Sequence, residues 1–152
     1  MSENTQAQVQ IERIYLKDAS FESPSAPAVF AQSGKPGFQL DLHTQVATLG
    51  ENRHEVVLSA TVTAKVGEEV AYIVEVQQAG VFVVQGAEGE ALRALLSIAG
   101  ANLLFPYLRE GADALVIKGG FPALQLAPVN FEAMYLQAMQ QQQAAAAEDA
   151  KH

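Results

Sequence analysis

A small polar constellation is the natural starting point for any catalytic function in this 152-residue chain. Asp41 and His43 alternate with Leu40 and Leu42, which places both polar side chains on one face of a predicted strand. Ser59 alternates in the same way on a neighbouring predicted strand and would be the nucleophile. Polar residues also alternate along exposed sheet faces that have no function. We therefore favour the structural interpretation and expect that the protein is not an enzyme.

Other sources of chemistry are scarce. Cysteine is absent, the three histidines lack metal-ligand spacing, and no glycine-rich phosphate loop follows a strand, so we expect no cofactor and no metal. The net charge of −8 argues against nucleic acid as a partner and suits a basic partner. The N-terminus lacks the basic segment followed by an apolar one that is typical of a signal peptide. No run approaches the roughly 18 apolar residues that span a bilayer. The sequence thus predicts a cytoplasmic protein without direct membrane insertion.

Alternating apolar and polar residues predict consecutive antiparallel strands at residues 38–48 and 56–66. A turn at residues 67–69 leads into another predicted strand, from residue 70 to about residue 78. Residues 9–21 also have an extended pattern. The proline-rich segment that follows them is too long for a hairpin turn, so it predicts a crossover connection.

Helical spacing replaces the strand pattern after Gly86. We expect an interruption near residues 100–102, a new helix capped by Asn102, and a stop at Gly119-Gly120. Asn130 is the predicted N-cap of a last helix. The fold class is therefore α+β, a four-stranded antiparallel sheet with a crossover after the first strand and helices packed on one face.

The predicted domain organisation is simple. Residues 9–140 form one domain, which is long enough to bury a core. Residues 1–8 are a flexible N-terminus, and the low-complexity residues 141–152 are a flexible tail.

Residues 102–131 form a strongly apolar stretch that contains no histidine, serine, threonine or cysteine. After one sheet face and one helix stripe are covered, several apolar side chains here and on the preceding strand still need a partner. An apolar surplus of this size is typical of an interface with other subunits or with ligands.

The sequence resembles the SecB protein-export chaperones over nearly all of residues 9–140. The motifs are long and occur in order: Arg13-Ile14-Tyr15-Leu16-Lys17-Asp18, Ser20-Phe21-Glu22, Glu75-Val76-Gln77-Gln78, Leu104-Phe105-Pro106-Tyr107, Gly120-Phe121-Pro122 and Leu126-Ala127-Pro128-Val129-Asn130-Phe131. The resemblance implies an ATP-independent chaperone that binds unfolded secretory precursor proteins and delivers them to the SecA translocation motor. It also implies a homotetramer built as a dimer of dimers, with hydrophobic channels on its surface.

Two candidate sites follow from this resemblance and from the strand pattern. The SecA-binding site comprises Asp18, Glu22, Ile73 and Glu75, which match the family's docking site for a basic, zinc-bearing segment of the motor. Strand parity directs Val70, Tyr72, Val74 and Val76 toward the helices, and Ala71, Ile73, Glu75 and Gln77 into solvent. For the client-binding groove we expect the large apolar side chains of Phe82, Val84, Phe105 and Phe121.

The sequence departs from the family in two places and leaves two other functions open. Ser33-Gly34-Lys35 stands where the family has an aromatic lid, and the acidic tail is short. A small-ligand binder or enzyme using the same groove would need converging polar groups, which the sequence does not show. A SecB-like chaperone of a toxin–antitoxin system is the other alternative.

Overall fold

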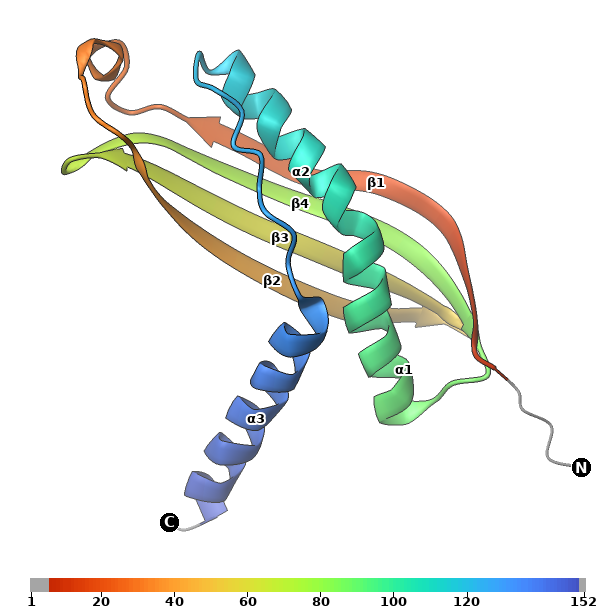
Figure 1. Cartoon of the computed structure of the whole chain (residues 1–152). Helices are drawn as coiled ribbons and strands as arrows, with labels where there is room; N and C mark the ends of the chain where they lie inside the picture. The colour runs from red at the N-terminus through yellow and green to blue at the C-terminus, as the bar shows by residue number, and fades with distance from the viewer. Residues whose placement is uncertain (1–5, 151–152) are drawn as a thin grey trace, which may run out of the picture.

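The computed structural model describes residues 6–150 and contains one four-stranded sheet with a long helix across one face (Figure 1). The strands are β1 (Gln8–Glu22), β2 (Gly37–Gly50), β3 (Arg53–Val66) and β4 (Glu69–Gln85). Their spatial order is β1-β4-β3-β2 and all pairs are antiparallel. The predicted α+β class, with a crossover after the first strand, is confirmed.

The alternation of side chains explains the two faces of the sheet. Apolar residues on the helix side of the central strands β3 and β4 are buried, namely Val56, Leu58, Ala60, Val62, Ala64, Tyr72, Val74 and Val76. β4 continues seven residues beyond the predicted end near Gln78, because Phe82 and Val84 maintain the same alternation. Gly80 permits this continuation, since a Cβ there would lie 2.9 Å from the Phe82 ring and 3.2 Å from Leu104.

The crossover between β1 and β2 contains a short 3-10 helix, Ala28–Ala31. Val29 is buried in the core, whereas the next side chain, Phe30, is 51% exposed. The Ser23 hydroxyl donates a hydrogen bond to the Ala71 carbonyl at 2.7 Å and holds the start of the crossover against β4.

The helical part begins with α1 (Gly89–Leu95), passes through a π-helical segment (Leu96–Gly100) and continues as α2 (Ala101–Lys118). The predicted interruption capped by Asn102 is wrong. Gly100 keeps helical dihedral angles, and its position is explained by packing, because a Cβ there would lie 3.2 Å from Val56. The predicted stop is confirmed, since α2 ends before Gly119 and Gly120 has φ of +91°.

This continuous helix corrects the expectation that no segment is apolar enough to span a bilayer. Within this 30-residue helix, Gly89–Lys118, an 18-residue window reaches a mean hydropathy of 1.4, and 33% of that window is buried in the chain. Its buried stripe, which includes Leu104, Leu108 and Val116, packs on the sheet as a core helix does. The other side of the helix leaves large apolar side chains exposed.

The last helix, α3 (Phe131–Ala150), extends away from the sheet (Figure 1). Its predicted cap is confirmed, because the Ala133 N–H donates to Asn130 Oδ1 at 3.0 Å. The helix includes residues 141–150, which were expected to be a flexible tail, since glutamine and alanine have high helix propensity. Residues 1–5 and 151–152, which belong to the predicted flexible ends, lie outside the described residues.

Candidate functional site

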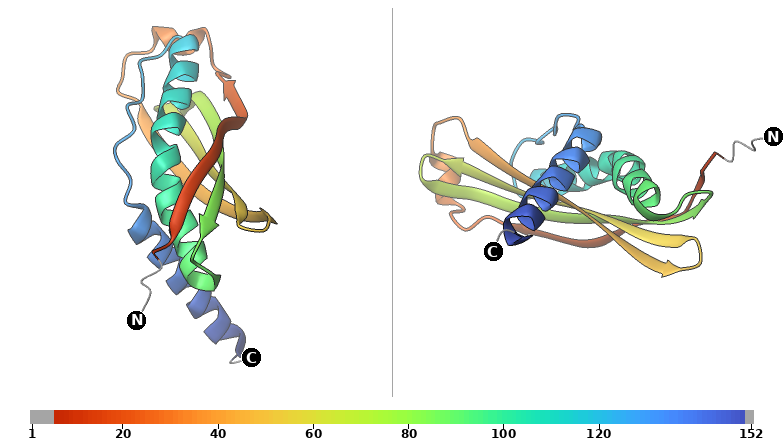
Figure 2. Two further views of the ribbon diagram at one scale, coloured as in Figure 1. Left: turned by 90° about the vertical axis from the view of Figure 1, so that its right-hand side faces the viewer. Right: turned by 90° about the horizontal axis from the view of Figure 1, so that it is seen from below.

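The helices lie on one side of the sheet, and the described residues leave the other side, here called the open face, uncovered (Figure 2). The strand register places three pairs directly opposite each other there: Asp18 with Gln77, Ser20 with Glu75, and Glu22 with Ile73. Direct partners on neighbouring strands point to the same face. The predicted SecA-binding residues Asp18, Glu22, Ile73 and Glu75 therefore share one surface, as strand parity required.

The acidic surface consists of Asp18, Glu22 and Glu75, whose side chains are all exposed. The Ser20 hydroxyl donates to Glu75 Oε2 at 3.4 Å. Asp41 lies in the same cross-strand row, because Glu75 is opposite Thr61 and Thr61 is opposite Asp41. The half-buried Ile73 adds an apolar contact beside these carboxylates.

One residue of the parity prediction is wrong. Ala71 was expected to point into solvent but is buried with the core residues, at 2% exposure. The register between β3 and β4 shifts after Ala64, and Ser23 of the crossover binds the Ala71 carbonyl. A bulge breaks simple alternation, and the crossover covers this end of β4.

The residues considered for catalysis also lie on this side of the sheet. His43 and Ser59 are direct cross-strand partners, and Asp41 is two residues from His43. Among the described residues, no hydrogen bond joins any two of the three. This geometry supports the structural interpretation of an exposed polar face.

A partly buried polar network, which sequence reasoning missed, lies beside the acidic surface. The Tyr15 hydroxyl donates to Glu55 Oε2, and the Lys17 ammonium contacts Glu55 Oε1 at 2.9 Å and Oε2 at 3.0 Å. Burial, followed by the Glu55 hydrogen bond, raises the pKa of Tyr15 to about 12. The hydrogen bond from Tyr15 and then that from Lys17 lower the pKa of Glu55. Glu55 is therefore held in its anionic form.

The helix face holds the residues predicted to line a client groove, and three of them need correction. Phe82 and Val84 are each 2% exposed and Phe105 is 6% exposed, so all three belong to the core. The reason is the path of the long helix, whose residues Leu104 and Leu108 are buried with them. A client cannot contact these side chains unless the helix moves.

Phe121, the fourth predicted client residue, is half-buried within an aromatic cluster of Phe21, Phe30, Tyr72 and Phe121. Its ring centroid lies 4.8 Å from that of Tyr72, 5.2 Å from that of Phe30 and 6.4 Å from that of Phe21. A Cβ at Gly119 would collide with the Phe21 ring, so this glycine is needed for the close packing. The cluster closes the core at the crossover end of the sheet.

The first residues of β2 extend this cluster with exposed apolar surface. Phe38 is 56% exposed and Leu40 is 40% exposed, although both have the helix-side parity. Phe38 lies in one cross-strand row with Ala64 and Tyr72, and thus beside the aromatic cluster. We call Phe30, Phe38, Leu40 and Phe121 the apolar end.

A segment between α2 and α3 runs over the sheet near the apolar end (Figure 1). Asp113 of α2 anchors it, because its Oδ1 accepts hydrogen bonds from the backbone N–H groups of Leu124 at 2.9 Å and Gln125 at 3.2 Å. The segment therefore has a fixed path without forming a helix or strand.

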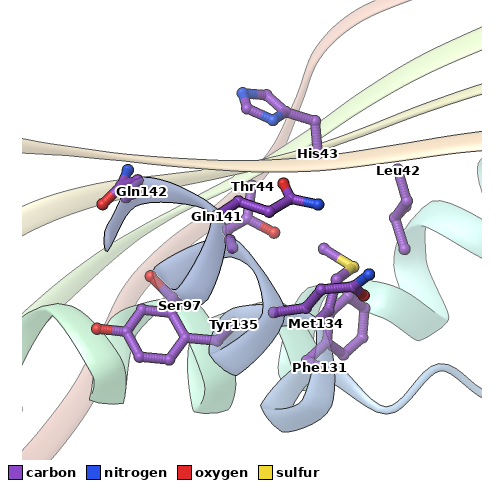
Figure 3. Close-up of a pocket in the computed structure, with 11 residues that line it drawn as sticks. Leu42, His43, Thr44, Ser97, Phe131, Met134, Tyr135, Gln141 and Gln142 are labelled. Atoms are coloured by element: carbon purple, nitrogen blue, oxygen red, sulfur yellow. The ribbon is translucent and has the colours of Figure 1, made fainter. Parts of the chain in front are cut away.

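Further along β2, a cleft of about 410 Å³ separates this edge strand from the start of α3 (Figure 3). Leu42 and Thr44 line it from β2, and Phe131, Met134 and Tyr135 line it from α3. Thr44 Oγ1 is buried and has no hydrogen-bond partner among the described residues. The cleft thus offers apolar contacts between the edge strand and α3.

Tyr72 leads to a prediction about alkaline pH. Burial, followed by the charge of Asp113, raises the pKa of Tyr72 to about 12, from an ordinary value of 10.0. Between these values the unfolded chain loses a proton that the folded chain keeps, so stability falls as the pH rises. We expect Tyr72→Phe to remove up to about 1.4 kcal/mol per pH unit from this fall. Urea unfolding between pH 9 and pH 11.5 measures it, and an unchanged pH dependence in the variant would contradict the assignment.

An acidic face on one side of a sheet and exposed apolar side chains on the other suit a binding protein, and comparison with known proteins identifies the family. The family model described as preprotein translocase subunit SecB matches residues 2–142. The chain is 52% identical to the protein-export protein SecB of Marinobacter nauticus, covering 99% of this chain and 97% of that protein. It is 50% identical to the SecB of Hahella chejuensis over 100% of both chains. The chain belongs to the SecB family of protein-export chaperones.

A solved structure supports the fold independently. The Mycobacterium tuberculosis SecB-like chaperone, solved in complex with an antitoxin peptide, matches with a TM-score of 0.68 at 20% identity. The match covers 80% of this chain and 90% of that one. At this level of identity the similarity concerns the arrangement of the sheet and helices.

Proposed function

We propose that this protein acts in the cytoplasm, holds unfolded secretory precursor proteins without ATP or any catalytic step, and delivers them to SecA. The exposed apolar end is the observation that carries the proposal, because a folded chain rarely leaves a group of such side chains beside its core without a partner. Membership of the SecB family is the basis for proposing that the clients are precursors destined for export.

Client binding works by mass action on the folding equilibrium of the precursor. A chaperone that binds only the unfolded state, present at 100 times its dissociation constant, shifts that equilibrium by about 2.7 kcal/mol. This is a large part of the stability of a typical domain. Phe30, Phe38 and Leu40 supply apolar area without demanding one partner sequence, which suits many different clients.

The edge strand β2 offers a second kind of contact to an extended client. It runs from Gly37 to Gly50 at the border of the sheet, and its 14 residues include neither lysine nor proline. An unprotected edge strand can pair with an added strand through backbone hydrogen bonds. A client segment on this edge would run from the apolar end toward the cleft beside Thr44. Every second side chain of the client would then contact apolar residues of the chaperone.

The acidic surface on the opposite side of the sheet is the proposed SecA site. Asp18, Glu22 and Glu75 attract a basic segment and orient it, while Ile73 supplies an apolar anchor. Because the acidic surface and the apolar end lie on opposite faces, the motor and the client can be bound at the same time.

Binding of unfolded chains is the direct test of the proposed client function. A secretory precursor held unfolded in denaturant is diluted into buffer containing the chaperone, and the native precursor is treated identically. We expect stable complexes with the diluted unfolded chain and none with the native one. Equal binding to both forms, or to neither, would contradict the proposal.

A homotetramer is the assembly that we propose for this chain. Exposed apolar residues occur on the edge strand β1, at Val9, Ile11 and Leu16, and on α2, at Leu103 and Tyr107. Sister subunits would cover these side chains and pair the free edge of β1. We expect light scattering of dilute protein to give four times the mass of the 16.2 kDa chain. A stable monomer at micromolar concentration would contradict this assembly.

A further inference from the structure

Lys17 is the one basic residue directly beside the acidic surface in sequence, next to Asp18. The β1–β4 register shifts between Leu16 and Asp18, so Lys17 has no direct partner on β4. A β-bulge of this kind re-aims a side chain. Lys17 consequently reaches the open face, where Asp18 also points.

The Lys17 charge is nevertheless directed away from Asp18. Its ammonium group contacts both carboxylate oxygens of Glu55, at 2.9 Å and 3.0 Å, on strand β3. The Tyr15 hydroxyl holds the same carboxylate. Tyr15 and Lys17 both cross above β4 to reach it, at a place where Ala79, the direct partner of Tyr15, has a small side chain. The network therefore has a fixed geometry.

Glu55 is well suited to retain the lysine. Its side chain is only 16% exposed, compared with 45% for that of Lys17, so the carboxylate is the more enclosed partner. The two hydrogen bonds that it accepts lower its pKa and keep it charged.

We propose that Glu55 is a positioning residue for SecA docking: it holds Lys17 away from Asp18 and so preserves the negative charge of the acidic surface. This inference rests on the proposed function of that surface. Without the Glu55 carboxylate, the free ammonium group has Asp18 as its neighbour on the same face. Pairing with Asp18 would then neutralise one of the three carboxylates that attract the basic segment.

The test compares the Glu55→Gln variant with a double variant, read by titration with purified SecA at low ionic strength. Glu55→Gln keeps a partner for the Tyr15 hydroxyl but releases Lys17, and we expect binding to weaken about three- to tenfold. Adding Lys17→Met removes the released charge and restores the net charge of the original pair. We expect the double variant to bind SecA as tightly as the wild type does, and a purely structural role for Glu55 would not give this rescue.

Glu12→Gln is the matched control. Glu12 lies on β1, six residues from Asp18, and pairs with Arg53 at 2.9 Å. Its substitution by Gln changes the net charge of the protein by the same amount as Glu55→Gln does. We expect little effect on SecA binding. Wild-type binding by Glu55→Gln, or a double variant as weak as the single one, would overturn the inference. If Glu75→Lys failed to weaken binding, the acidic surface would not be the SecA docking site, and the proposed function of that surface would be wrong.

Discussion

Glu75→Lys is expected to weaken SecA binding by at least about tenfold at low ionic strength, a loss of about 1.4 kcal/mol or more. The substitution places a positive charge between Asp18 and Glu22, on the surface proposed to receive a basic segment. Like charges brought together at an interface are strongly unfavourable. The loss should shrink at high salt, because screening already weakens the wild-type attraction.

Titration of the variant with SecA, alongside a client-capture assay, separates docking from general damage. Glu75 is exposed, and exposed charges contribute little to stability, so folding and client capture should survive. Glu68→Lys provides the matched control, since Glu68 is an exposed residue in the turn before β4. Loss of both activities in Glu75→Lys would indicate structural damage, and unchanged SecA binding would exclude Glu75 from the interface.

A second prediction compares a core residue with a proposed client-binding residue, both on the helix side of the sheet. Phe82→Ala should lower the free energy of unfolding by about 3–5 kcal/mol, because it empties a fully buried site. Phe38→Ala removes a side chain that is 56% exposed and should cost far less stability. Capture of unfolded precursor should instead fall in the Phe38 variant.

Denaturant unfolding and a capture assay on both variants measure this contrast. Leu49→Ala is the control for the loss of an exposed apolar side chain, because Leu49 is 52% exposed and lies at the other end of β2. A stable Phe82→Ala protein with impaired capture would show that the groove lies beneath α2. Normal capture by Phe38→Ala would remove the start of β2 from the client site.

Strand parity predicted which residues share a face, and it succeeded where the ladder is regular. Asp18, Glu22 and Glu75 could be placed together from their alternation and from the family resemblance. Parity does not reveal how far a helix extends over a face. Phe38 and Phe82 both point to the helix side, but α2 covers the middle of the sheet and leaves the start of β2 exposed.

The remaining errors have similar local causes. A glycine such as Gly100 usually marks the end of a helix. Here it lies within the helix and lets the helix pack closely against Val56. The bulge at Lys17 has no clear signal in the sequence, so the contact between Lys17 and Glu55, 38 residues apart, could not be predicted. Such contacts depend on the exact register of three strands.

The refolding of a denatured secretory precursor in the absence of nucleotide is the decisive assay for the holding of unfolded clients. The precursor is diluted from denaturant with increasing amounts of this protein, and the recovery of its native fluorescence is followed over time. We expect refolding to slow progressively and an excess of chaperone to hold most of the precursor unfolded. An unchanged refolding rate at every chaperone concentration would contradict it.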